Sequence, residues 1–256
     1  MMAFPQFGSP LNGRGALAAL PALAPGEAPA TSAGAAKLIA LHFAGMAAVV
    51  AVMWSFFEPN AGLDRTAMED ARNVGFGAGV VAFAAAIGGR LRPQYARVLA
   101  PAFALFGGLF IGGLTIAAEF RFPGIAVQTT TLTACVFLAM YAIYVTKIIK
   151  LTDQLKAAIA AAAGGIGLVF LVSFALLLLF DIRLGFIHGS GSGAVLWFGF
   201  VALIAAMNLL VDFERIDRLD QRRAPKVAEW HAALALMTSF VWLYLSILRM
   251  LRNVRR

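Results

Sequence analysis

The sequence predicts an all-α, polytopic membrane protein with seven transmembrane helices. Of its 256 residues 61% are hydrophobic and only 13% are charged, about half the charged fraction of an ordinary soluble domain. The mean hydropathy is +0.82. Seven segments reach the length of about 20 apolar residues that a helix needs to cross a bilayer. Because a span must satisfy its own backbone hydrogen bonds in lipid, and no alternating strand pattern is present, helices are the expected structure.

The seven segments are separated by short polar connections. In chain order they cover residues 37–57, 73–89, 98–118, 124–149, 155–180, 194–211 and 230–250. All are apolar around the whole helix, unlike the one-sided helices of soluble proteins. The second segment is the shortest and is rich in Ala and Gly, so we expect it to lie inside the bundle. The last segment is long enough to cross, which favours seven complete spans over a re-entrant final helix.

The first 35 residues have a different composition. Five of the ten prolines lie there, among Ala, Gly and Ser. Such a stretch cannot build a packed core and is predicted to be disordered. It lacks the basic start and compact apolar run of a signal peptide, so the first helix is expected to be an uncleaved anchor. We therefore divide the chain into a tail, 1–35, and a transmembrane domain, 36–256.

The distribution of positive charge predicts the orientation. Thirteen of the 21 Lys and Arg residues fall on the side that carries the N-terminus, and loops with such an excess face the cytoplasm. The formal charge of +8 therefore indicates topology and a lipid bilayer as partner, and not nucleic acid. Four C-terminal arginines break the pattern, because seven complete spans place Arg249, Arg252, Arg255 and Arg256 on the opposite side.

No constellation for catalysis or for a resident cofactor is present. Cys135 stands alone, so the chain cannot form an internal disulfide or a cysteine-based metal site. The histidines His42, His188 and His231 lie apart, without metal-ligand spacing, and no serine has a nucleophile motif. A retinal photoreceptor would need a lysine in the last span, and 230–250 contains none. We predict that the protein is not an enzyme.

Asp212 is the most informative ionisable residue. It ends the apolar run 195–211, yet the helical pattern continues to Leu219, so Asp212 is expected about two turns inside the end of the helix. A carboxylate at such a depth costs about 3 kcal/mol unless it is paired or hydrated. Asn208, one turn earlier, would share its face and extend a polar stripe inward. The alternative is an interfacial carboxylate that marks where lipid ends.

Several motifs from about residue 37 to the C-terminus resemble a known family. The motifs are LAP (99–101), GLFIG (108–112), FPGIAVQ (122–128), VFLAM (136–140), NLLVDFERID (208–217), APK (224–226), EW (229–230) and WLYLSILR (242–249). In this order they resemble the bacterial branch of the Bax inhibitor family, also called transmembrane Bax inhibitor motif proteins. The resemblance implies a bundle of six helices around a central seventh, and a pH-sensitive calcium leak across the cell's inner membrane.

The family's gating residues carry over only in part. In that family two aspartates of the sixth and seventh helices share a proton, and an arginine at the end of the second helix helps to hold the closed state. The sixth-helix acid matches Asp212 and the arginine matches Arg90. The seventh-helix acid has no match, because one register places Ser239 there and another places Ser246. We prefer Ser239, which lies nearer the depth of Asp212.

The missing acid changes the expected function. A serine can donate a hydrogen bond to Asp212, but it cannot share an acidic proton with it, so we expect weak or acid-shifted pH gating. We also expect weak calcium selectivity, with Asp212 as a transient ligand, because Ca²⁺ favours several oxygen ligands. The alternative function is a non-conducting membrane scaffold or stress-response interaction protein on the same fold. The sequence leaves protein partners and the conducted cation open.

Overall fold

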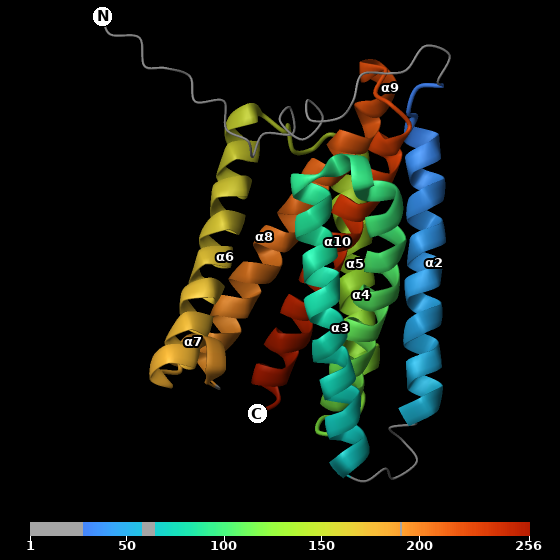
Figure 1. The fold of residues 1–256 in the computed structure, drawn as a ribbon. Helices are drawn as coiled ribbons and strands as arrows, with labels where there is room; N and C mark the ends of the chain where they lie inside the picture. The colour runs from blue at the N-terminus through green and yellow to red at the C-terminus, as the bar shows by residue number, and fades with distance from the viewer. Residues whose placement is uncertain (1–27, 58–64, 190) are drawn as a thin grey trace, which may run out of the picture.

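The computed structural model describes residues 28–57, 65–189 and 191–256, and every element in these ranges is a helix (Figure 1). The long helices are α2 (Ser32–Phe57), α3 (Arg65–Leu91), α4 (Ala96–Glu119), α5 (Ile125–Val145), α6 (Asp153–Phe180), α8 (Ser192–Asp217) and α10 (Val227–Val254). Three short helices lie in the connections: η1 (Pro93–Tyr95), α7 (Gly185–His188) and α9 (Leu219–Arg222). Within the described ranges, seven helices are long and apolar enough to cross a membrane, which confirms the predicted fold class.

Most helices are longer than their apolar segments, because the backbone remains helical through the polar residues at each end. The clearest case is α8, which continues beyond the apolar run to Asp217. The first helix begins at Ser32, so residues 32–35, which we assigned to the tail, are helical. Its start is bound to the first turn of α10, since the backbone N–H of Thr31 donates to Glu229 Oε1 at 2.8 Å. The predicted tail up to residue 27 lies outside the described residues.

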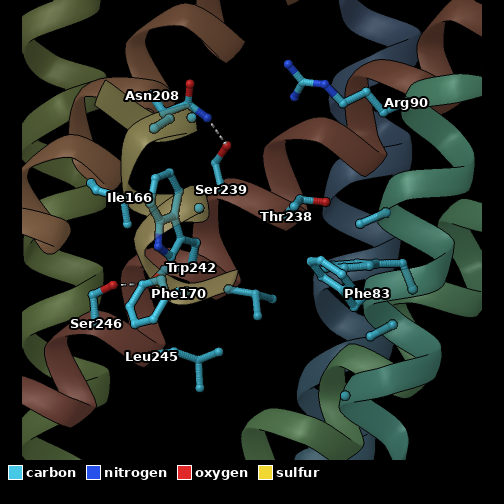
Figure 2. A pocket seen from close by; sticks show the side chains of 18 of the residues that line it. Phe83, Arg90, Ile166, Phe170, Asn208, Thr238, Ser239, Trp242, Leu245 and Ser246 are labelled. Carbon is cyan, nitrogen blue, oxygen red and sulfur yellow. Dashed lines mark hydrogen bonds between the residues drawn. The ribbon is translucent and has the colours of Figure 1, made fainter. Parts of the chain in front are cut away.

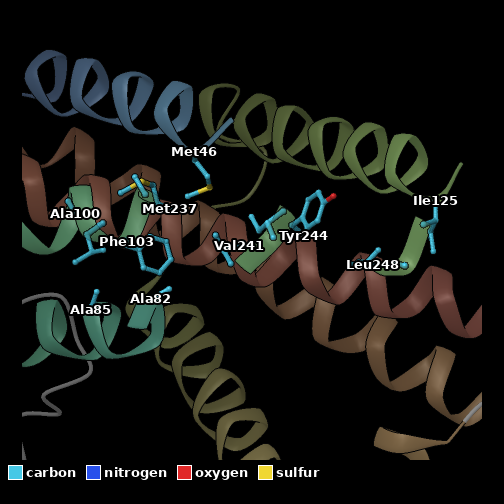
Figure 3. Packing of buried hydrophobic residues seen from close by; sticks show 14 residues of the cluster. Met46, Ala82, Ala85, Ala100, Phe103, Ile125, Met237, Val241, Tyr244 and Leu248 are labelled. Atoms are coloured by element: carbon cyan, nitrogen blue, oxygen red, sulfur yellow. The ribbon is translucent and has the colours of Figure 1, made fainter. Parts of the chain in front are cut away.

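Helix α10 occupies the centre of most of the bundle. It packs against α2, α3, α4, α5 and α8, and its inward side chains, with those of α2, α3 and α4, form the main hydrophobic core (Figure 3). Met237 and Phe103 are both almost completely buried there. Helix α6 differs from the others because it packs mainly on α8, with Trp242 of α10 packed against the contact between the two. Helix α6 stands to one side of α10 (Figure 1), because a cavity separates the two helices.

Glycines bring α3 and α4 into close contact. A methyl group added at Gly113 would lie 2.3 Å from the Ala71 carbonyl oxygen and 2.7 Å from Gly75 Cα. The glycines of α3 mostly serve its contact with α4, although Gly89 packs against Leu234 of α10, and the expectation that the second span lies inside the bundle is wrong. Its other face is open, with Val80 71% and Phe83 68% exposed.

The seven helices give the bundle two distinct ends. The N-terminal end carries Ser32 and the connection from α8 to α10, whereas the C-terminal end carries the last residues of α10 (Figure 1). Helix α10 runs between the two ends without turning back, which agrees with seven complete spans and not with a re-entrant last helix. At the C-terminal end, Arg255 Nη1 donates to the Pro123 carbonyl oxygen at 2.9 Å.

Candidate ion-pathway site at Asp212

Asp212 lies in the contact between α8 and α10 and is 2% exposed. Ser239 Oγ donates to Asp212 Oδ2 at 2.5 Å. Arg215 Nη1 donates to Asp212 Oδ1 at 3.0 Å, forming an ion pair one turn along the same helix. Each carboxylate oxygen thus has its own donor, which is how a buried charge is tolerated. The structure places Asp212 inside the packed helix bundle.

A chain of hydrogen bonds links the two helices at this level. Asn208 Nδ2 donates to Ser239 Oγ at 2.8 Å (Figure 2). Because the Ser239 hydroxyl accepts from Asn208, its own hydrogen is free to bond Asp212. Of the two registers that the sequence left open, the structure brings Ser239 to Asp212. Ser246 lies two turns further along α10, where its hydroxyl donates to the Trp242 carbonyl oxygen at 2.7 Å.

An arginine that the sequence did not single out makes the ion pair with Asp212. Arg90 ends α3, and its side chain extends toward the cavity at the level of Asn208 and Ser239 (Figure 2). It acts on Asp212 only through its charge at longer range, whereas Arg215 makes the direct contact. Sequence reasoning counted Arg215 for orientation alone. The i, i+3 spacing to Asp212 was the signal that could have identified it.

A cavity of about 1020 Å³ adjoins these residues, between α3, α4, α6, α8 and α10. The residues that line the cavity include Asn208, Ser239, Ser246 and Arg90. Asp212 is not one of the lining residues. The middle is apolar, with Phe83 of α3 facing Phe170 and Leu245 across the space (Figure 2). Six basic and two acidic side chains line the cavity: Arg90, Lys156, Arg215, Arg218, Arg249 and Arg252, with Asp153 and Glu214.

The site is poor in ligands for a resident metal ion. Within the ranges that the structure describes, no group of three or more His, Cys, Asp or Glu side chains could hold one. Both oxygens of Asp212 are already engaged by Ser239 and Arg215. A cation that used Asp212 as a ligand would also lie close to the Arg215 guanidinium, whose positive charge would repel it.

Comparison with known proteins supports the resemblance drawn from the sequence motifs. A family model described as Bax inhibitor 1 like matches residues 19–256, and thus covers all seven helices and every residue of the candidate site. No curated protein and no solved structure shows a significant match. The chain belongs to the Bax inhibitor 1-like family of multi-pass membrane proteins.

Proposed function

We propose that this protein is an ion leak pathway and not an enzyme, that it holds no resident cofactor, and that Asp212 controls conduction. In this proposal the protein lies in the cell's inner membrane with its N-terminus in the cytoplasm, as the distribution of Lys and Arg predicts. It passes calcium or other cations with weak selectivity and weak pH gating. The observation that carries the proposal is the bond from Ser239 to Asp212, where a pH-sensing pair needs a second carboxylate.

The hydroxyl of Ser239 limits how strongly pH can act at this site. Two carboxylates a few ångströms apart cannot both ionise easily, so such a pair titrates as a unit near neutral pH. Asp212 faces one hydroxyl and one guanidinium, and neither exchanges an acidic proton with it. Asp212 by itself can change its charge by a single unit at most, which supports a leak with shallow pH dependence.

The surroundings of Asp212 also argue against strong calcium selectivity. Ca²⁺ takes about six to eight oxygen ligands, and hydrogen bonds from Ser239 and Arg215 already occupy the Asp212 carboxylate. Basic side chains outnumber acidic ones along the adjoining cavity. A cation in the cavity would therefore be bound weakly and released easily.

Ion flux in proteoliposomes tests this proposal. Calcium, sodium and proton-sensitive dyes would be read in parallel between about pH 5 and 8. We expect a shallow pH profile for the native protein and an altered flux for Asp212→Asn. Ser239→Asp restores two facing carboxylates and should make the pH profile steep. Ser246→Asp, the same change two turns along α10, is the matched control and should leave the profile shallow.

Two results would contradict the proposal. Steep gating near neutral pH in the native protein would show that a single acid suffices, and the role given to Ser239 would be wrong. Unchanged flux in Asp212→Asn would remove Asp212 from the mechanism.

A non-conducting membrane scaffold is the second candidate function. It is favoured by the ion pair between Asp212 and Arg215, which neutralises the buried acid, and by the mostly basic lining of the cavity. A scaffold would show no flux of any of the three ions above that of empty liposomes. The result would have to hold for the native protein and for Ser239→Asp, with both shown to be folded.

A further inference from the structure

We propose that the C-terminal end of the cavity binds an anionic phospholipid. Its phosphate would lie at Arg249 and Arg252, and an acyl chain would run along the apolar groove between α3 and α6. The inference rests on the juxtaposition of two unpaired arginines with an apolar space that opens toward lipid. It does not depend on whether the protein conducts ions.

The two arginines form a positive site without an acidic partner. Both line the cavity, and in the described part of the chain neither forms an ion pair with an acid. The Arg249 guanidinium lies over the Phe198 ring, 5.4 Å from its centre. Arg252 Nε is buried and has no hydrogen-bond partner, and the charges that act on Arg252 are other arginines. A phosphate would satisfy these donors through charge-assisted hydrogen bonds.

Between the two arginines and the N-terminal end of the bundle the cavity is apolar, and it opens between α3 and α6. Helices α3 and α6 both line it, but α3 packs mainly on α4, and α6 packs on α8. Phe83 of α3 and Phe174 of α6 line the cavity, and they are 68% and 62% exposed. In a bilayer this opening meets acyl chains, so a lipid can enter the groove from the side.

The length of the groove matches one leaflet. Arg249 and Thr238, both on α10 and both lining the cavity, are eleven residues apart, or about 16 Å at the rise of an α-helix. Half of the hydrocarbon core of a bilayer is about 15 Å. A lipid of the leaflet at the C-terminal end, with its phosphate at Arg249, would thus end its chain near the polar wall at Thr238 and Ser239. This match favours a phospholipid over a free anion or a peptide.

Binding of defined lipids to the purified full-length protein tests the proposal. Native mass spectrometry and thermal unfolding would compare phosphatidylglycerol, phosphatidylcholine with the same acyl chains, and inorganic phosphate. We expect phosphatidylglycerol to be retained most strongly and to raise the unfolding temperature. Each arginine near an anionic headgroup accounts for about a fivefold difference in binding. The double variant Arg249→Gln/Arg252→Gln should therefore bind phosphatidylglycerol about 25-fold more weakly.

Two further variants distinguish the effect of general positive charge, the effect of blocking the groove and the effect of lost folding stability. Arg183→Gln removes an exposed positive charge at the same end of the bundle, outside the cavity lining, and should bind as the native protein does. Gly167 lines the cavity, and a side chain added there meets nothing within 4 Å. Gly167→Leu should therefore fill the groove and weaken lipid binding, without lowering the unfolding temperature of the lipid-free protein.

Several outcomes would overturn the proposal. Equal retention of phosphatidylcholine would show that the arginines do not select an anion. Stabilisation by inorganic phosphate as large as that by phosphatidylglycerol would indicate a free-anion site without a groove. Unchanged binding in the double arginine variant, or in Gly167→Leu, would place the lipid elsewhere on the protein.

Discussion

Gly113→Ala provides the most direct test of how the bundle is held together. The added methyl would lie 2.3 Å from the Ala71 carbonyl oxygen, whereas ordinary contact begins at 3.4 Å. Since the opposing atoms belong to the backbone, α3 and α4 must move apart by about 1 Å, which forfeits roughly a quarter to a half of the dispersion attraction across the gap. Overpacking of this kind costs up to about 3 kcal/mol. A gain in helix propensity of about 1 kcal/mol offsets it, leaving a net loss near 2 kcal/mol.

Gly164→Ala is the matched control, because a side chain added at Gly164 in α6 meets nothing within 4 Å. It gains the same helix propensity without the clash, so its stability should rise by up to about 1 kcal/mol. The two variants should differ by about 3 kcal/mol. Denaturant unfolding in a fixed detergent, followed by far-UV circular dichroism, measures this difference. If Gly113→Ala proved as stable as Gly164→Ala, close packing of α3 on α4 would not be a determinant of stability.

Three further substitutions test individual contacts. Arg215→Gln removes the charged partner of buried Asp212 and should lower the free energy of unfolding, measured with denaturant, by about 2 kcal/mol. An unchanged unfolding midpoint would mean that charges at longer range are enough to stabilise the buried carboxylate. Glu119→Gln replaces one of the two carboxylate oxygens that accept from backbone N–H groups at the start of α5 by an NH2 group that cannot accept, and should cost about 1 kcal/mol, with faster hydrogen exchange there. Gly34→Ala would place a methyl 2.2 Å from Glu229 Oε1. Because that carboxylate is the end of a flexible side chain, we expect faster hydrogen exchange at the start of α2, with the global unfolding midpoint unchanged; a lower midpoint would refute this interpretation.

The seven helices were predictable because membrane crossing imposes a minimum apolar length that each segment meets by itself. The arrangement of the helices was less predictable from the sequence. The small residues of α3 were expected to bury it, but in the structure they mostly serve its close contact with α4, as at Gly75 and Gly113. The small residues of a helix indicate how closely another backbone can approach it. They do not indicate how many other helices surround it. The same limit applies to α6, whose apolar sequence suits contact with lipid as well as contact with protein.

The candidate site was predictable where its residues share a helix face or a depth. Asn208 was expected to extend the polar stripe from Asp212, and the two are joined in the structure through Ser239. The family pattern indicated Arg90, which lines the adjoining cavity, but it did not indicate Arg215, which makes the ion pair with the acid. Which of two arginines reaches a carboxylate depends on side-chain direction, and a sequence pattern does not carry that information.

Three of the four C-terminal arginines, which broke the predicted charge distribution, have structural roles in the bundle. Arg249 lies over the Phe198 ring and lines the cavity with Arg252, while Arg255 donates to the backbone of the connection between α4 and α5. The orientation rule applies to positive charges in loops near the ends of spans. Arginines that a helix directs into a cavity or onto backbone carbonyls serve packing and binding, so they are weak evidence against seven spans. If that reasoning is right, replacing Arg249 and Arg252 by Gln should weaken lipid binding and leave the orientation unchanged, which protease protection of each terminus in sealed vesicles would show.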